Sequence, residues 1–141
     1  MGFSLTGAAA IIGISIFVVA EMFAANLLPA VTDTNDSYND MKERIVDQIQ
    51  TDITITDATT SDNGTNYDLN ITVENTGGIT LEVGDFNILI NGTGQQFTCS
   101  SSYLYIGSEG YFNVTNLSGT GPRRLKVVTN NGISDYYDYV V

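Results

Sequence analysis

The most frequent pattern with a chemical meaning in this sequence is the Asn-x-Ser/Thr sequon with a middle residue other than proline. Such asparagines are acceptors for N-linked glycans, which are added only on the outward side of a membrane. All of these sequons follow an apolar N-terminal segment, so they predict an N-terminus inside and a C-terminal part outside. The candidate glycosylation sites are Asn35, Asn63, Asn70, Asn91, Asn113 and Asn116.

Side chains suited to acid/base catalysis or metal binding are scarce. The chain has no His, one Cys and only two Lys, at positions 42 and 126. A nucleophilic Ser or Cys needs a base beside it, and His is the usual one. The segment from Asp33 begins like a calcium loop, but its sixth and twelfth positions are Tyr38 and Arg44, where such a loop needs Gly and Glu. We therefore predict no enzyme activity, no catalytic residues, no cofactor and no metal site.

Length and charge narrow the possible classes further. A chain of 141 residues accommodates one domain and one appended element. Its net charge of -11 makes it repel nucleic acids, so we predict no nucleic-acid partner. Cys99 has no second cysteine to pair with in the chain. It is either a small buried apolar residue or is paired between chains.

Residues 1–28 are predicted to form an N-terminal transmembrane anchor. The stretch from Phe3 to Ala20 contains no charged side chain, and as a helix it would be about 27 Å long, close to the thickness of a bilayer core. We expect it to remain on the protein, because a cleavable secretory signal would carry a basic region and a shorter apolar core. Glu21 is interpreted as a solvated residue at the outer interface or as a helix contact. Candidate helix-packing residues are Gly7, Ala8, Ala9 and Gly13, although weak helix formers in an ordinary anchor are the alternative.

Residues 29–51 are predicted to form a short amphipathic helical stalk. Pro29 interrupts the apolar run, so we expect a helix break there. Spacings of three and four residues then mark one helical stripe, which would pack against the domain or against a sister subunit. Its members are Tyr38, Met41, Ile45 and Ile49.

Residues 52–141 are predicted to form an extracellular all-β domain. Apolar residues there alternate with polar ones, which is typical of half-buried strands, and turn segments rich in Asn and Gly separate the strands. These turns are expected to need the positive φ that Gly supplies. About seven short strands at this spacing favour an immunoglobulin-like β-sandwich. The expected core positions include Ile53, Ile55, Tyr67, Leu69, Ile71, Val73, Leu81, Val83, Phe86, Ile88, Ile90, Leu125 and Val127.

The last strand and a basic cluster before it are the candidate contact surface. Tyrosine is enriched at protein interfaces, and the strand carries aromatic residues on both faces. A core position for some of these tyrosines is the alternative. The basic cluster could attract an acidic partner, or it could be a solvated loop edge. The candidate contact residues are Tyr136, Tyr137, Tyr139, Arg123, Arg124 and Lys126.

Three segments together resemble the archaellum accessory protein F family (FlaF-like) of archaea. The first is the start Met1-Gly2-Phe3-Ser4 leading into the apolar helix. The second is the turn Val73-Glu74-Asn75-Thr76-Gly77 followed by Phe86-Asn87-Ile88-Leu89-Ile90-Asn91-Gly92. The third, and the most specific, is Leu125-Lys126-Val127-Val128-Thr129-Asn130-Asn131-Gly132-Ile133. The sister family G shares the plan of a helix followed by a sandwich.

This resemblance implies a non-enzymatic stator component of the archaeal motility machinery. Such a protein would be a single-pass protein of the cell membrane, with its β-sandwich outside the cell beneath the S-layer. Its partners would be the S-layer protein and the sister archaellum protein G, in a homo- or hetero-oligomer. The alternative is a filament subunit, an archaellin or type IV pilin-like protein whose N-terminal helix lies in the filament core.

Overall fold

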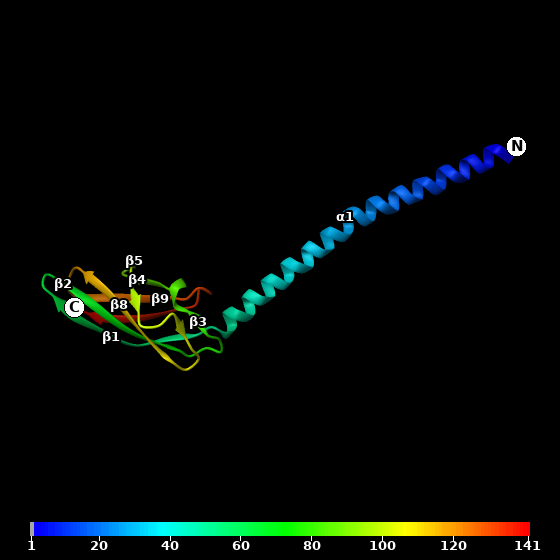
Figure 1. The fold of residues 1–141 in the computed structure, drawn as a ribbon. Helices are drawn as coiled ribbons and strands as arrows, with labels where there is room; N and C mark the ends of the chain where they lie inside the picture. Colours follow the sequence, from blue (N-terminus) through cyan, green and yellow to red (C-terminus); the bar gives the residue numbers. More distant parts are fainter. Residues whose placement is uncertain (1) are drawn as a thin grey trace. The chain divides into compact units, whose positions relative to one another are not determined.

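A computed structural model of the chain describes residues 2–141, so Met1, the first residue of the predicted anchor, lies outside the described residues (Figure 1). The chain divides into two compact units, one up to Glu43 and one from Arg44 to Val141. Each unit is described by itself.

A single helix, α1, runs from Gly2 to Gln50 and contains Pro29 in its interior. The predicted break at Pro29, with a separate stalk helix after it, is therefore wrong. Proline removes one backbone hydrogen bond, but the helix-forming residues on both sides continue the ladder. On the following turns, the Thr32 and Thr34 hydroxyls donate to the carbonyl oxygens four residues earlier, at 3.0 and 2.7 Å. An 18-residue window of the helix reaches a mean hydropathy of 2.2, enough by length and composition to cross a membrane.

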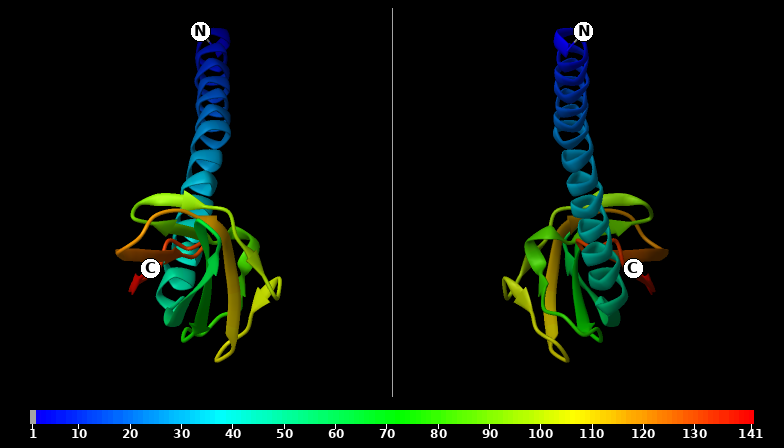
Figure 2. Two further views of the ribbon diagram at one scale, coloured as in Figure 1. Left: turned by 90° about the vertical axis from the view of Figure 1, so that its left-hand side faces the viewer. Right: turned by 90° about the vertical axis from the view of Figure 1, so that its right-hand side faces the viewer.

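The second unit contains antiparallel sheets only. One four-stranded sheet has the order β1-β2-β8-β6, a second has the order β10-β9-β4-β5, and β3 pairs with β7 (Figure 2). The strands are β1 (Ile53–Asn63), β2 (Asn66–Asn75), β3 (Leu81–Glu82), β4 (Asn87–Ile90), β5 (Thr93–Gln95), β6 (Thr98–Cys99), β7 (Tyr103–Leu104), β8 (Glu109–Leu117), β9 (Pro122–Val128) and β10 (Ser134–Val140), with a 3-10 turn η1 (Val83–Asp85) between β3 and β4.

Side chains from both four-stranded sheets form one apolar core, which makes the unit a β-sandwich. The alternation predicted from the sequence is confirmed, because every expected core position is buried. Phe112 from β8 lies fully buried at the centre, with its ring stacked on Phe86 and tilted against Phe97. Burial of alternate residues thus explains why each strand presents one apolar face.

A hydrogen bond beside a bulge joins the edges of the two sheets. The pairing of β1 with β2 shifts between Ile55 and Asp57, which marks a bulge in the edge strand. Next to this bulge, the backbone N–H of Ile55 donates to the Asp135 carboxylate on β10 at 2.8 Å. This bond joins β1 of one sheet to β10 of the other and closes one side of the sandwich.

Glycines serve two different purposes in the turns. Gly64, Gly92 and Gly132 have φ of 75, 81 and 80°, so the expected need for positive φ is met there. In the turn after β2 the expectation is wrong, because Gly77 does not have a positive φ. A Cβ at Gly77 would instead lie 2.5 Å from both the Gln50 carbonyl oxygen and the Asp52 nitrogen. That glycine is required because the chain entering the sandwich passes directly against it.

Polar contacts attach the last helical turn to the sandwich. Gln48 donates through Nε2 to the Asn131 carbonyl at 3.1 Å, and Asn131 donates through Nδ2 to the Thr51 hydroxyl at 2.7 Å. Thr51 is buried and in turn donates to the Asp47 carbonyl at 2.7 Å. The compact unit consequently extends back to Arg44, beyond the domain start expected at residue 52.

Candidate interaction surfaces

The outer face of β9 and β10 carries a cluster that we call the basic patch, formed by Arg124, Lys126 and Tyr136. Register places Lys126 opposite Tyr136 on the neighbouring strand. The Arg124 guanidinium lies 5.5 Å and the Lys126 ammonium 5.1 Å from the centre of the Tyr136 ring. Both cations lie within the range of cation–π attraction. Leu89 on β4 continues this row on the other side of Lys126.

Electrostatics of the basic patch are set by the two cations. A hydrogen bond with the Lys126 ammonium is the main reason that the pKa of the Tyr136 hydroxyl is lowered. Arg124 also forms an ion pair with Asp138 at 3.1 Å, with both side chains well exposed. An exposed pair of this kind contributes only ~0–1 kcal/mol to stability, so both cations keep most of their capacity for an external partner.

The remaining contact candidates are not part of this patch. Tyr139 is 6% exposed and belongs to the core, where its hydroxyl lies 3.0 Å from that of Tyr67. Burial raises the pKa of Tyr139, and the hydrogen bond with Tyr67 raises it further. Tyr137 is half-buried against the core, and Arg123 donates to the Ser118 carbonyl at 3.1 Å. For Tyr139 the core alternative therefore holds, and an exposed contact role is excluded.

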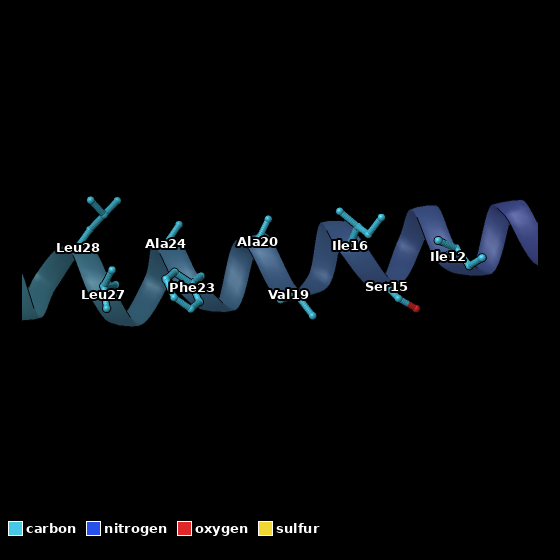
Figure 3. Close-up of a pocket in the computed structure, with 9 residues that line it drawn as sticks. All are labelled: Ile12, Ser15, Ile16, Val19, Ala20, Phe23, Ala24, Leu27 and Leu28. Carbon is cyan, nitrogen blue, oxygen red and sulfur yellow. The ribbon is translucent and has the colours of Figure 1, made fainter.

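The apolar part of α1 presents a shallow open groove between side chains of the same helix (Figure 3). The small residues Ser15, Ala20 and Ala24 line it together with larger side chains such as Ile16 and Phe23. The remaining lining residues are Ile12, Val19, Leu27 and Leu28. Small residues between large ones let another helix approach closely.

This groove differs from the packing face expected from the sequence. Gly7, Gly13 and Glu21 are exposed on the same helix, as are Ala8 and Ala9, but none of them lines the groove. The signal that could have identified it is the spacing of four residues from Ile16 through Ala20 and Ala24 to Leu28. That spacing places all four on one helical face.

Most sequons present an exposed asparagine. Asn35 is exposed on α1, and Asn63 is exposed at the end of β1. Asn91 and Asn116 are exposed in left-handed backbone conformations, with φ of 50 and 62°, which Asn tolerates better than most residues. Accessibility permits glycan attachment at these four positions.

Two sequons face each other across the sheet. Asn70 on β2 lies directly opposite Asn113 on β8, and the Asn113 amide donates to the Asn70 side-chain oxygen at 2.7 Å. Asn70 is exposed, whereas Asn113 is half-buried. A glycan on one of the two would therefore crowd the other, and the more exposed Asn70 is the better acceptor of the pair.

Metal-ligating side chains do not gather at one place in the described part of the chain. No group of three or more His, Cys, Asp or Glu side chains there could hold a metal ion. Cys99 is half-buried and packs against the core.

The chain thus combines a helix long and apolar enough to cross a membrane with an antiparallel β-sandwich. The archaeal-type flagellin family matches residues 2–138, and the chain belongs to this family. The chain is thus related to proteins of the archaellum, as the sequence resemblance predicted. No curated protein matches the sequence.

Solved structures similar to this chain include the archaellum periplasmic stator protein FlaG from Sulfolobus acidocaldarius. The match has a TM-score of 0.53 and 20% sequence identity, and it covers 63% of this chain and 99% of that chain. At this identity the likeness concerns the fold, and it confirms the predicted β-sandwich, while the predicted apolar helix is present as α1. The family and this neighbour are structural proteins and not enzymes.

Proposed function

We propose that this protein is a membrane-anchored stator component of the archaeal motility machinery. The observation that carries the proposal is the match of the sandwich to nearly the whole length of a solved archaellum stator protein. The exposed apolar side chains of α1 support an anchoring role, because such a surface is stable in lipid or against other helices. In this proposal the helix holds the protein in the membrane, and the sandwich binds a fixed structure outside the cell.

The proposed partners are the S-layer protein and the sister archaellum protein G. Exposed sequons on the sandwich support an extracellular position beneath the S-layer, since glycans are added only on that side. The anchor is proposed to comprise residues 1–28, and the part of α1 after it would serve as a spacer.

Binding to isolated S-layer tests this proposal directly. The full chain in detergent micelles would be incubated with S-layer sheets at neutral and mildly acidic pH and then sedimented. We expect co-sedimentation that saturates with added protein. Micelles that carry an unrelated single-helix membrane protein are the control. Absence of binding at both pH values would refute the stator proposal.

A filament subunit is the second candidate. It is favoured by the match of the archaeal-type flagellin family to residues 2–138 and by the open apolar groove of α1, which would suit a helical filament core. Intact mass spectrometry of the native protein separates the two candidates. A mature chain beginning at Met1 or Gly2 supports the anchor, whereas a mature chain beginning at Phe3 supports the filament subunit.

A further inference from the structure

Four carboxylates form a row on one face of α1. They are separated by three or four residues, which places them on the same side of the helix. All four are exposed, and the only ion pair among residues 2–141 is the one between Arg124 and Asp138. We call this set the acidic row, and it consists of Asp33, Asp36, Asp40 and Glu43.

The acidic row lies on the side of the helix opposite the apolar stripe. At 100° per residue, Tyr38, Met41 and Ile45 fall about 120 to 180° from the centre of the row. All three are exposed on α1, at 59, 52 and 46%. The helix can therefore contact one neighbour through the stripe while its carboxylates remain free for another.

The basic patch has the complementary chemistry. Three of the five basic residues of the chain lie on β9, and two of these, Arg124 and Lys126, belong to the patch. Around the cations the surface is partly apolar, with Tyr136 51% and Val140 71% exposed on the adjacent strand. A cationic face with apolar neighbours suits a partner that is acidic and amphipathic.

Spacing relates the two surfaces. Side chains two residues apart on a strand are about 6.7 Å apart, which is the separation of Arg124 and Lys126. Residues four apart on a helix are separated by about 6 Å along its axis, as for Asp36 and Asp40. Two neighbouring carboxylates of the row can therefore face both cations at once.

From this complementarity we propose that the basic patch binds the acidic row of a second copy of this chain. The contact is heterologous, because it joins two different surfaces, so it can repeat from copy to copy. A second copy is favoured as the partner because the chain itself carries an exposed helix face of the matching charge and spacing. The proposal concerns self-association and does not require S-layer binding.

A charge-reversal experiment tests the proposal with the full chain in detergent micelles. Tagged chains would capture untagged chains on a resin. The patch-reversed variant carries R124E and K126E, and the row-reversed variant carries D33K, D36K, D40K and E43K. The control has the same net charge as the row-reversed variant but reverses exposed carboxylates of the sandwich, through D57K, D62K, E82K and D85K.

Both reversed variants should capture their own kind about tenfold more weakly than the wild type captures itself. Mixing the two should restore capture, because each then meets a surface of opposite charge. The control should capture itself at least as well as the wild type. Circular dichroism of each variant verifies the fold, and recovery in the mixture cannot arise from misfolding.

Other outcomes overturn the proposal. Unchanged self-capture by the patch-reversed variant, failure of the mixture to recover, or a monomeric wild-type chain would each do so. Loss of S-layer binding with unchanged self-capture in the patch-reversed variant would assign the patch to the S-layer instead. Intact self-capture with no S-layer binding by the wild type would count against the stator proposal alone.

Discussion

Replacing Gly77 by alanine should destabilise the sandwich strongly, because the new Cβ has no space. It would lie 2.5 Å from the Gln50 carbonyl oxygen and 2.5 Å from the Asp52 nitrogen, which are both backbone atoms. A flexible side chain could move aside, but here the entering chain itself must shift. Overpacking of this kind typically costs about 1–3 kcal/mol, and the rigid neighbours favour the upper end.

Hydrogen bonds at the same place add to the cost. The Gly77 N–H donates to the Asp52 carbonyl at 3.0 Å, and the Gly78 N–H donates to the Gln50 carbonyl at 2.7 Å. A shift that relieves the clash would lengthen both bonds, each of which contributes ~0.5–1.5 kcal/mol. We expect a total loss of about 3 kcal/mol in the free energy of unfolding, which for a unit of about 100 residues lowers Tm by more than ~10 °C.

Thermal and urea unfolding of the full chain in detergent, followed by circular dichroism at a strand wavelength, would measure this loss. Gly84→Ala is the matched control, since a Cβ there meets nothing within 4 Å and the φ of Gly84 is not positive. We expect the control to change stability by less than ~0.5 kcal/mol. Equal stability of the two variants would show that the close backbone approach is not the reason that position 77 requires glycine.

Three further predictions concern buried polar groups. Asn75→Ala should cost ~2–3 kcal/mol in urea unfolding, because the fully buried Asn75 amide donates to the Ile79 and Leu104 carbonyls at 2.8 and 3.0 Å; a loss below ~0.5 kcal/mol would contradict this. Tyr139→Phe should lower the free energy of unfolding by ~1 kcal/mol, because it leaves the Tyr67 hydroxyl unpaired. Replacing both tyrosines by Phe should cost less than this single replacement. Additive losses would argue against a hydrogen bond between the two hydroxyls. The pKa of Tyr139 is raised in the folded state above its unfolded value near 10, so its stabilising contribution should be complete below pH 10 and be lost as the pH rises above it. Tyr139→Phe should therefore reduce the loss of stability at alkaline pH, measured by urea unfolding at several pH values. An unchanged pH profile would show that Tyr139 is not the group that titrates.

Local patterns predicted much of this fold. Alternating apolar residues such as Leu69, Ile71 and Val73 identified the strands, because a strand buried on one face repeats every two residues. The N-terminal part of α1 was identified for a different reason, because an uncharged apolar run of that length suits a membrane-spanning helix. Pro29 was misjudged because proline costs a helix one hydrogen bond without necessarily ending it, and the length of helix on either side decides the outcome.

The interaction surfaces were only partly predictable. Tyr136 and Tyr139 lie three residues apart and were equal candidates from the sequence, yet one is exposed between two cations and the other is buried beside Tyr67. Which face of β10 turns inward depends on the pairing of β10 with β9 and on the packing of the opposite sheet. Those contacts join residues far apart in the chain, so no local pattern reports them.

The sequence by itself determined an apolar N-terminal segment without charged side chains, an acidic β-rich domain with sequons and a shortage of catalytic side chains, because each of these follows from residue type and short-range periodicity. Only the tertiary structure decided that Gly77 is needed for a close approach, that Asn75 is a buried donor and that Arg124, Lys126 and Tyr136 form one surface. The physical reason is that these properties depend on which distant segments come within a few ångströms of one another. Strand register and sheet packing set those distances, and both arise from the fold as a whole.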